Sequence, residues 1–274
     1  MRNGTKMTTT KTNSTNDDSR ESSQLFAIAD LHLPGGMNKT MEVFGPQWDH
    51  HFERIRADWL NRVHPDDVVL IPGDISWAMT MDAAKEDLME IARLPGKKIL
   101  LKGNHDFWWS SVGRLRSLLP AGMYAVQHSC VDCEEFVVCG TRGWILPGGE
   151  NPMTAQDMKI YNRELQRLEM ALKEARSIAQ KRPVVVMMHY PPLSADNLDT
   201  GFTALMEEYT VDTAVYGHLH GPGIRTAFQG VYHDIAYHLV SCDALGFQMA
   251  EIKIAKKTEK IFLGISEKNI SEIS

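Results

Sequence analysis

Short runs of consecutive apolar residues alternate along the chain with longer segments in which apolar residues recur every three or four positions. The short runs are typical of strands buried on both faces of a sheet, and the longer segments are typical of helices that cover such a sheet. The alternation therefore predicts an α/β protein. We see no internal repeat and no dividing linker, so we expect one domain over residues 25–274.

Apolar runs predict the strands, and two of them, MYAVQ and EEFVVCG, are predicted to be adjacent. The runs cover residues 25–30, 68–74, 98–106, 123–127, 134–140, 183–189 and 211–218. Further strands are expected between Gly230 and Ile265, with turns at Asp243–Gly246 and Lys256–Glu259. Helical spacing predicts helices over residues 47–63, 82–94, 111–119, 154–180 and 202–209.

The predicted helix over residues 154–180 is longer than a crossover between two strands requires. It could cap a site or form a partner surface, but we interpret it as an ordinary covering helix. Its charged residues are expected to face solvent. They are Lys159, Arg163, Glu164, Arg167, Glu174 and Arg176.

Residues 1–24 are rich in Ser, Thr and Asn and nearly lack apolar side chains, so we expect a disordered N-terminal tail. The true start could be Met1 or Met7. No segment has the apolar core of a secretory signal, and no run has the length of a membrane span. We therefore expect a protein without a membrane partner.

The four cysteines do not form a zinc-knuckle pattern, because Cys130 and Cys133 make one C-x-x-C without a second pair. We expect this pair in a hairpin turn, with free thiols. Free thiols suit the reducing cytoplasm, which is the expected location.

Basic residues number 29 and acidic residues 35, which gives a formal net charge of -6. This balance argues against a protein that coats nucleic acid or an anionic membrane. It is compatible with a small anionic substrate, because a bound metal ion can reverse the local field.

Side chains that can bind metal ions follow five of the predicted strands. In a sheet of this kind, function gathers beyond the carboxyl ends of the strands. The residues there are Asp30, His32, Asp74, Asn104, His105, Asp106, His189, His218 and His220. One His at such a position is most often structural. Gathering so many polar groups without a common partner would be costly, so the set predicts a metal site.

This ordered set resembles the calcineurin-like metallophosphoesterase family, whose pattern is D-x-H, G-D, G-N-H-[DE], a single His and G-H-x-H. The chain carries each part in that order between Asp30 and His220. The resemblance implies a two-sheet α/β/β/α sandwich and a metal-dependent hydrolase of phosphate esters. The resemblance says little about the substrate, for which we expect a phosphodiester or a small phosphorylated metabolite and not nucleic acid, on the grounds given below.

The resemblance also implies two divalent metal ions. One is bound by Asp30, His32, Asp74 and His220, and the other by Asp74, Asn104, His189 and His218. The shared carboxylate bridges the ions, and a hydroxide between them attacks the phosphorus in line. Carboxylate, imidazole and amide ligands suit Mn, our preferred ion, or Fe or Zn.

In the family, the His of G-N-H-[DE] approaches the phosphate and protonates the leaving oxygen, a role that His105 takes by resemblance. Asp106 is expected to orient that imidazole and raise its proton affinity. Asn104 lies beside His105 and is expected to face the substrate as well. Arg142 lies between two glycines after a strand, and either contacts a phosphate oxygen or forms a surface ion pair.

The tryptophans near the motifs are Trp77, Trp108, Trp109 and Trp144. They could stack on a substrate, but we interpret them as packing residues that hold loops.

The chain departs from the protein phosphatases of the family at two places. They carry G-D-x-x-D-R-G where this chain reads GDISWAM from Gly73 to Met79, and Arg where it has Lys102. The missing Arg disfavours a Ser/Thr protein phosphatase. A nuclease is disfavoured by the acidic charge balance. A metal-binding scaffold of the same fold is disfavoured because every ligand is present.

Overall fold

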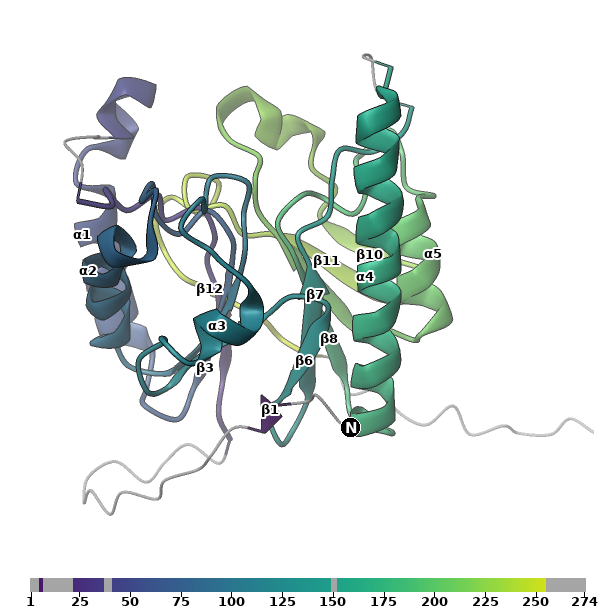
Figure 1. The fold of residues 1–274 in the computed structure, drawn as a ribbon, viewed down its shortest axis with the longest axis horizontal. Helices are drawn as coiled ribbons and strands as arrows, with labels where there is room; N and C mark the ends of the chain where they lie inside the picture. Colours follow the sequence, from purple (N-terminus) through teal and green to yellow (C-terminus); the bar gives the residue numbers. More distant parts are fainter. Residues whose placement is uncertain (1–4, 7–21, 37–40, 149–151, 255–274) are drawn as a thin grey trace, which may run out of the picture.

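Two β-sheets stack face to face, and helices cover the outer face of each, as the computed structural model shows (Figure 1). The structure describes residues 5–6, 22–36, 41–148 and 152–254. This arrangement confirms the expected α/β/β/α sandwich. Within the described residues, no helix combines the length and apolar character needed to cross a membrane.

The first sheet has five strands in the order β12-β2-β3-β4-β5. Its strands are β2 (Leu25–Ala27), β3 (Val68–Pro72), β4 (Lys97–Leu101), β5 (Met123–Val126) and β12 (Ala250–Glu251). β2 to β5 are parallel, and β12 pairs with β2 in the antiparallel direction. The carboxyl ends of β2, β3 and β4 therefore lie at one edge of this sheet.

The second sheet has seven strands in the order β1-β6-β7-β8-β9-β11-β10. They are β1 (Thr5–Lys6), β6 (Ser129–Asp132), β7 (Val137–Thr141), β8 (Val184–Met188), β9 (Thr213–Tyr216), β10 (Gly230–Tyr232) and β11 (Ile235–Leu239). β7, β8, β9 and β11 are parallel to one another. β6 and β10 run antiparallel to their partners β7 and β11.

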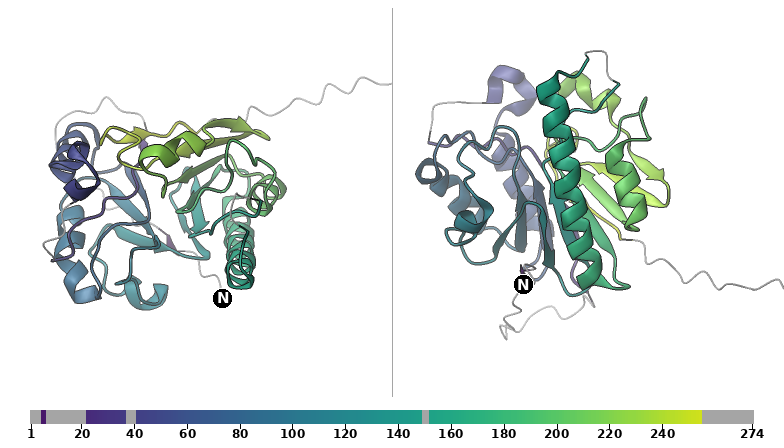
Figure 2. Two further views of the ribbon diagram at one scale, coloured as in Figure 1. Left: turned by 90° about the horizontal axis from the view of Figure 1, so that it is seen from above. Right: turned by 45° about the vertical axis from the view of Figure 1, so that its right-hand side comes forward.

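Helices α1 (His51–Arg62), α2 (Met81–Ala92) and α3 (Val112–Arg116) cover the first sheet, and α4 (Ala155–Ala179) and α5 (Gly201–Glu208) cover the second (Figure 2). Three 3-10 helices complete the described elements: η1 (Met41–Phe44), η2 (Pro46–Trp48) and η3 (Gly221–Thr226). α4 begins with a capping box in which Thr154 and Asp157 satisfy each other's backbone N–H groups.

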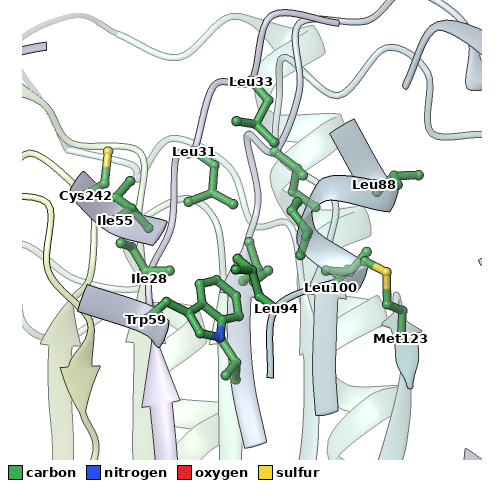
Figure 3. Packing of buried hydrophobic residues seen from close by; sticks show 14 of the residues in the cluster. Ile28, Leu31, Leu33, Ile55, Trp59, Leu88, Leu94, Leu100, Met123 and Cys242 are labelled. Carbon is green, nitrogen blue, oxygen red and sulfur yellow. The ribbon is translucent and has the colours of Figure 1, made fainter. Parts of the chain in front are cut away.

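Alternate residues of the first sheet face opposite layers of the core. Phe26 and Leu100 pack against the covering helices, where Trp59 and Ile55 lie (Figure 3). Leu70 instead points into the layer between the two sheets. Burying side chains of this size contributes about 1.5–3 kcal/mol each. The layer between the sheets therefore holds them together, and an outer layer on each side holds the covering helices.

The predicted pairing of MYAVQ with EEFVVCG is wrong. The first run forms β5 in the first sheet, whereas the second forms β7 in the other sheet. β7 pairs with β6 in a hairpin, so Cys133 lies in the turn as expected, whereas Cys130 lies inside β6. The described cysteines are free and buried, as expected. The β6 segment SCVD is short and half polar, so its sequence pattern did not predict a strand.

The expectation that the charged residues of α4 all face solvent is wrong for Glu164. Its side chain is fully buried, because Thr141 and two arginines provide partners for the carboxylate. The other helices start and end within a few residues of the predicted bounds, except that 47–63 divides into η2 and α1. The predicted turn at 256–259 and most of the predicted tail lie outside the described residues.

Candidate active site

The loops after β2, β3, β4, β8 and β9 meet between the two sheets and bring the predicted metal ligands into one cluster. Asp30, which follows β2, lies at its centre. One of its carboxylate oxygens is 3.6 Å from Nε2 of His220 and 3.8 Å from Nδ1 of His189. The other accepts a 3.0 Å hydrogen bond from the backbone N–H of His218. Asp30 of the first sheet therefore contacts predicted ligands that follow strands of the second sheet.

The first group of possible ligands consists of Asp30, His32 and His220, whose ligand atoms all lie within 4.8 Å of one another. Nε2 of His32 lies 3.9 Å from a carboxylate oxygen of Asp74, beyond hydrogen-bond distance. Its Nδ1 is buried and has no hydrogen-bond partner among the described residues. Nε2, and not Nδ1, faces the cluster, at a distance from Asp74 that leaves room for a metal ion bound to both atoms.

The second group surrounds Nε2 of His189. This atom lies 2.7 Å from Oδ1 of Asn104, 3.3 Å from Nδ1 of His218 and 3.5 Å from Oδ2 of Asp74. Ligand atoms that share one ion at about 2.0–2.2 Å lie roughly 3–3.5 Å apart. The spacing of these four ligand atoms therefore fits a second metal ion.

Four of the ligand residues have a left-handed backbone, which is uncommon outside glycine. The φ angles are 61° for Asp30, 44° for His32, 51° for Asp74 and 73° for His218. Such conformations cost about 1–3 kcal/mol each and persist where the surrounding structure enforces them. The sharp turns direct ligand side chains from successive strand ends into the same space.

Two glycines next to ligands allow these close approaches. A Cβ on Gly103 would lie 2.0 Å from Oδ1 of Asp74, and one on Gly217 would lie 2.6 Å from Oδ2 of Asp30. Only a residue without a side chain fits at either position. The glycines of the G-N-H and G-H-x-H motifs therefore make room for carboxylates of other loops.

The buried carboxylates of the cluster repel one another. Burial, together with the charges of Asp106 and Asp30, raises the pKa of Asp74 to about 9. Burial would also raise the pKa of Asp30, but contacts with His220 and the other imidazoles hold it below its usual range. Divalent cations would relieve this repulsion between carboxylates.

Burial keeps most of the imidazoles neutral, which is the form that binds metals. It lowers the pKa of His32 and of His189 to about 3, and that of His218 to about 4. For His220, burial is outweighed by Asp243 and Asp30, which raise the pKa to about 10. The carboxylates around His220 thus favour positive charge at the place where a cation would bind. Donor chemistry and electrostatics both fit a metal centre.

Support for the ligands comes from residues that sequence reasoning missed. Oδ1 of Asp243 lies 2.8 Å from Nδ1 of His220, and its Oδ2 accepts a bond from the N–H of Gly221. Trp48 packs against the rings of both His32 and His220. Asp243 lies shortly after β11, much as the proposed ligands lie shortly after their strands. This position in the sequence could have identified it as a candidate site residue. Trp48 carried no signal in the sequence.

Asp106 is fully buried and joins two loops of the site. Its carboxylate accepts hydrogen bonds from the backbone N–H groups of Ile75, Ser76 and Gly103 and from the indole N–H of Trp108. These bonds fix the loop after β3 against the loop after β4. The sequence had suggested only a contact with His105.

The His105 side chain lies beside the ligand cluster. Its ring centroid is 4.6 Å from that of Trp77 and 5.9 Å from that of His32. Its backbone N–H donates a 2.8 Å bond to Oδ1 of Asp74. The loop therefore holds a half-buried imidazole next to the two possible metal positions.

The tryptophans hold the loops, as predicted. Trp108 and Trp109 are buried in the core, and Trp77 stacks on His32 with centroids 4.8 Å apart. Trp144 donates to Asp157 and carries the guanidinium of Arg142 over its ring at 4.7 Å.

A cavity of about 550 Å³ opens on the His32 side of the cluster. Met41, Trp48 and Phe52 give it an apolar lining, and Glu42, Glu86 and Glu90 give it acidic groups. A substrate bound at the cluster therefore meets an apolar and acidic space on this side.

The fold and the site together define a metallohydrolase of the α/β/β/α type. The family model described as calcineurin-like phosphoesterase matches residues 24–222, and the chain belongs to this family. It is accordingly a metal-dependent hydrolase of phosphate esters.

Comparison with solved structures found proteins that share little sequence with this chain. A protein of unknown function from Aquifex aeolicus has a similar structure, with 16% identity, a TM-score of 0.47, and coverage of 84% of this chain and 96% of that one. A phosphopantetheinyl hydrolase from Mycobacterium tuberculosis shares 18% identity with a TM-score of 0.48, covering 84% of this chain and 95% of that one. Comparison with curated proteins found no match.

Proposed function

We propose that the protein cleaves phosphate esters with two divalent metal ions held side by side. The observation that carries this proposal is the position of Asp74. Its Oδ2 faces both ligand groups, at 3.9 Å from His32 and 3.5 Å from His189. A carboxylate between two groups of ligands is suited to bridge two ions.

Asp30, His32, Asp74 and His220 would hold one ion, and Asp74, Asn104, His189 and His218 the other. When bound, the ions supply a nucleophile from water and neutralise charge on the phosphoryl oxygens. The mixture of carboxylate, imidazole and amide ligands suits Mn, which is our choice of ion, and equally Fe or Zn.

His105 donates the proton that the leaving oxygen needs. Its half-buried imidazole lies beside the ligands, and its backbone is fixed by the bond to Asp74. Arg142 contacts a phosphate oxygen in this proposal. It follows β7 directly, and its backbone carbonyl accepts a bond from the N–H of His189, so the residue lies beside the second ligand group. Asp106 acts indirectly, by fixing the loop that carries Asn104 and His105.

The proposed substrate is a phosphodiester or a small phosphorylated metabolite. A Ser/Thr protein phosphatase is disfavoured because Ala78 stands where those enzymes carry the phosphate-binding Arg. Residues 25–274 would form one catalytic domain. The free, buried thiols suit a cytoplasmic enzyme.

The test is to load purified protein with Mn and measure hydrolysis of bis(4-nitrophenyl) phosphate and of 4-nitrophenyl phosphate. We expect turnover of the diester, with Arg142→Ala raising KM or lowering kcat at unchanged metal content. A metal-loaded protein that cleaves neither ester would favour the scaffold alternative.

A further inference from the structure

Four cationic side chains gather on the side of the ligand cluster opposite the acidic cavity. They are Lys102, Arg142, Arg163 and Arg167, which we call the cationic group. Lys102 follows β4, Arg142 follows β7, and the two other arginines lie in the N-terminal half of α4. This half of the helix lies near the carboxyl ends of β7 and β8, because α4 runs back along the sheet from the loop after β7 (Figure 1).

Arg142 places the cationic group against the second ligand group. Its carbonyl oxygen accepts bonds from the N–H groups of His189, at 3.2 Å, and Tyr190, at 2.9 Å. Its guanidinium lies on Trp144, whose ring is 5.2 Å from that of Tyr190. Tyr190 in turn packs on His218 at 4.1 Å. A continuous row of contacts thus joins the guanidinium to two ligands.

Glu164 holds the arginines of α4 at the end of β7. Its Oε1 lies 2.7 Å from Nη1 of Arg167 and 3.5 Å from Nε of Arg163. Its Oε2 accepts a 2.5 Å bond from the hydroxyl of Thr141, the residue before Arg142. The Glu164 carboxylate is fully buried, and its hydrogen bond from Arg167 holds that guanidinium at the site. Arg163 makes the longer contact, and its side chain is half exposed.

The cationic group has fewer counter-charges than cations. The carboxylates that act on it are Glu164, at the arginines, and Asp106, which acts on Lys102. The contacts described for the other two cations are with uncharged groups: Lys102 donates to the carbonyl oxygen of Trp109, and Arg142 lies over the ring of Trp144. The side chains of Lys102 and Arg142 are both half-buried. Half-buried cations that repel one another are stabilised by a bound anion.

We propose that the cationic group binds a second phosphate of the substrate, joined to the phosphate that is attacked. This inference rests on the proposed function and narrows the substrate class to diphosphate esters. The first phosphate would lie at the metal ions, and the second would lie over Arg142 toward α4. Guanidinium groups bind phosphate oxygens in bidentate geometry, and a phosphate carries more negative charge than a carboxylate, which suits a group of several cations.

The two sides of the ligand cluster differ in charge, and this difference would determine in which orientation a diphosphate ester binds. The cavity beside His32 carries acidic groups and an apolar lining, and would repel a second phosphate. The group released from the attacked phosphate would therefore face the cavity or solvent, while the diphosphate extends to the cationic group.

The test measures how strongly inorganic phosphate and imidodiphosphate inhibit hydrolysis of bis(4-nitrophenyl) phosphate by the Mn-loaded enzyme, with free Mn held constant. We expect Arg167→Gln to raise the Ki of imidodiphosphate about tenfold more than that of phosphate, because one charge-assisted hydrogen bond is lost. Arg163→Gln should act in the same direction and keeps the Arg167–Glu164 pair. The exposed Lys173 lies on the same helix, and Lys173→Gln should change neither Ki.

An equal change of both Ki values in both variants, or no change in either, would overturn the second-phosphate site while leaving the hydrolase proposal intact. Absence of diester hydrolysis by metal-loaded wild-type protein would instead contradict the proposed function itself. Metal content measured on every variant separates loss of the anion site from loss of the ions.

Discussion

Oδ1 of Asp243 lies 2.8 Å from Nδ1 of His220, so a carboxylate in the loop after β11 orients a proposed metal ligand in the loop after β9. A metal-binding imidazole usually has its other ring nitrogen held in this way, which fixes the tautomer and the direction of the lone pair. Asp243 thereby extends the site beyond the five motifs that identify the family.

Asp243→Asn should lower metal affinity about 10- to 100-fold, because the amide orients His220 less strongly and removes a negative charge. Titration of metal-free protein with Mn, followed by calorimetry, measures the effect. Asp234→Asn is a suitable control, since Asp234 is exposed and lies outside the site. Unchanged affinity in Asp243→Asn would show that the contact does not support the ligand.

Asp106→Ala should lower the free energy of unfolding by about 3 kcal/mol or more, because four N–H donors lose their acceptor in a buried place. Urea denaturation of the metal-free protein measures this loss. If stability were unchanged and only the kcat fell, the contact with His105 suggested by the sequence would be the main role of Asp106.

His105→Asn should lower kcat by about 10²- to 10⁴-fold on esters with a poor leaving group, with metal content unchanged. The loss should be much smaller with 4-nitrophenyl esters, because nitrophenolate leaves without a proton. Comparing the two kinds of ester in one variant measures this difference. An equal loss on both would mean that His105 binds the phosphate and does not act as the acid.

Removing metal ions with a chelator should abolish hydrolysis and lower the Tm, since the buried carboxylates of Asp30 and Asp74 then face each other without cations. Adding Mn should restore both. A differential scanning measurement with and without Mn tests this. An equal Tm with and without Mn would contradict a metal site in the folded protein.

The sequence was most informative where one local pattern decides the structure. A buried parallel strand followed at once by Asp, His or Asn places those side chains at a sheet edge, so Asp30, Asp74 and His189 could be grouped without coordinates. Strong helical spacing likewise predicted α4 to within one residue at each end.

The remainder depends on contacts between segments far apart in the chain. β5 and β7 belong to different sheets, and the sequence of MYAVQ does not tell which sheet it joins. Glu164 is charged and lies on a helix, so only its bonds to Thr141 and Arg167 explain its burial. The same holds for Asp243, whose partner His220 is 23 positions away.

The most direct test of two cooperating ions is the ratio of Mn to protein at which hydrolysis of bis(4-nitrophenyl) phosphate reaches its maximum. Titration of metal-free protein should saturate at about two ions per chain, as a two-metal site requires, and Asp74→Ala should lose turnover because its carboxylate faces both ligand groups. Saturation at one ion, or full turnover in Asp74→Ala, would contradict the account.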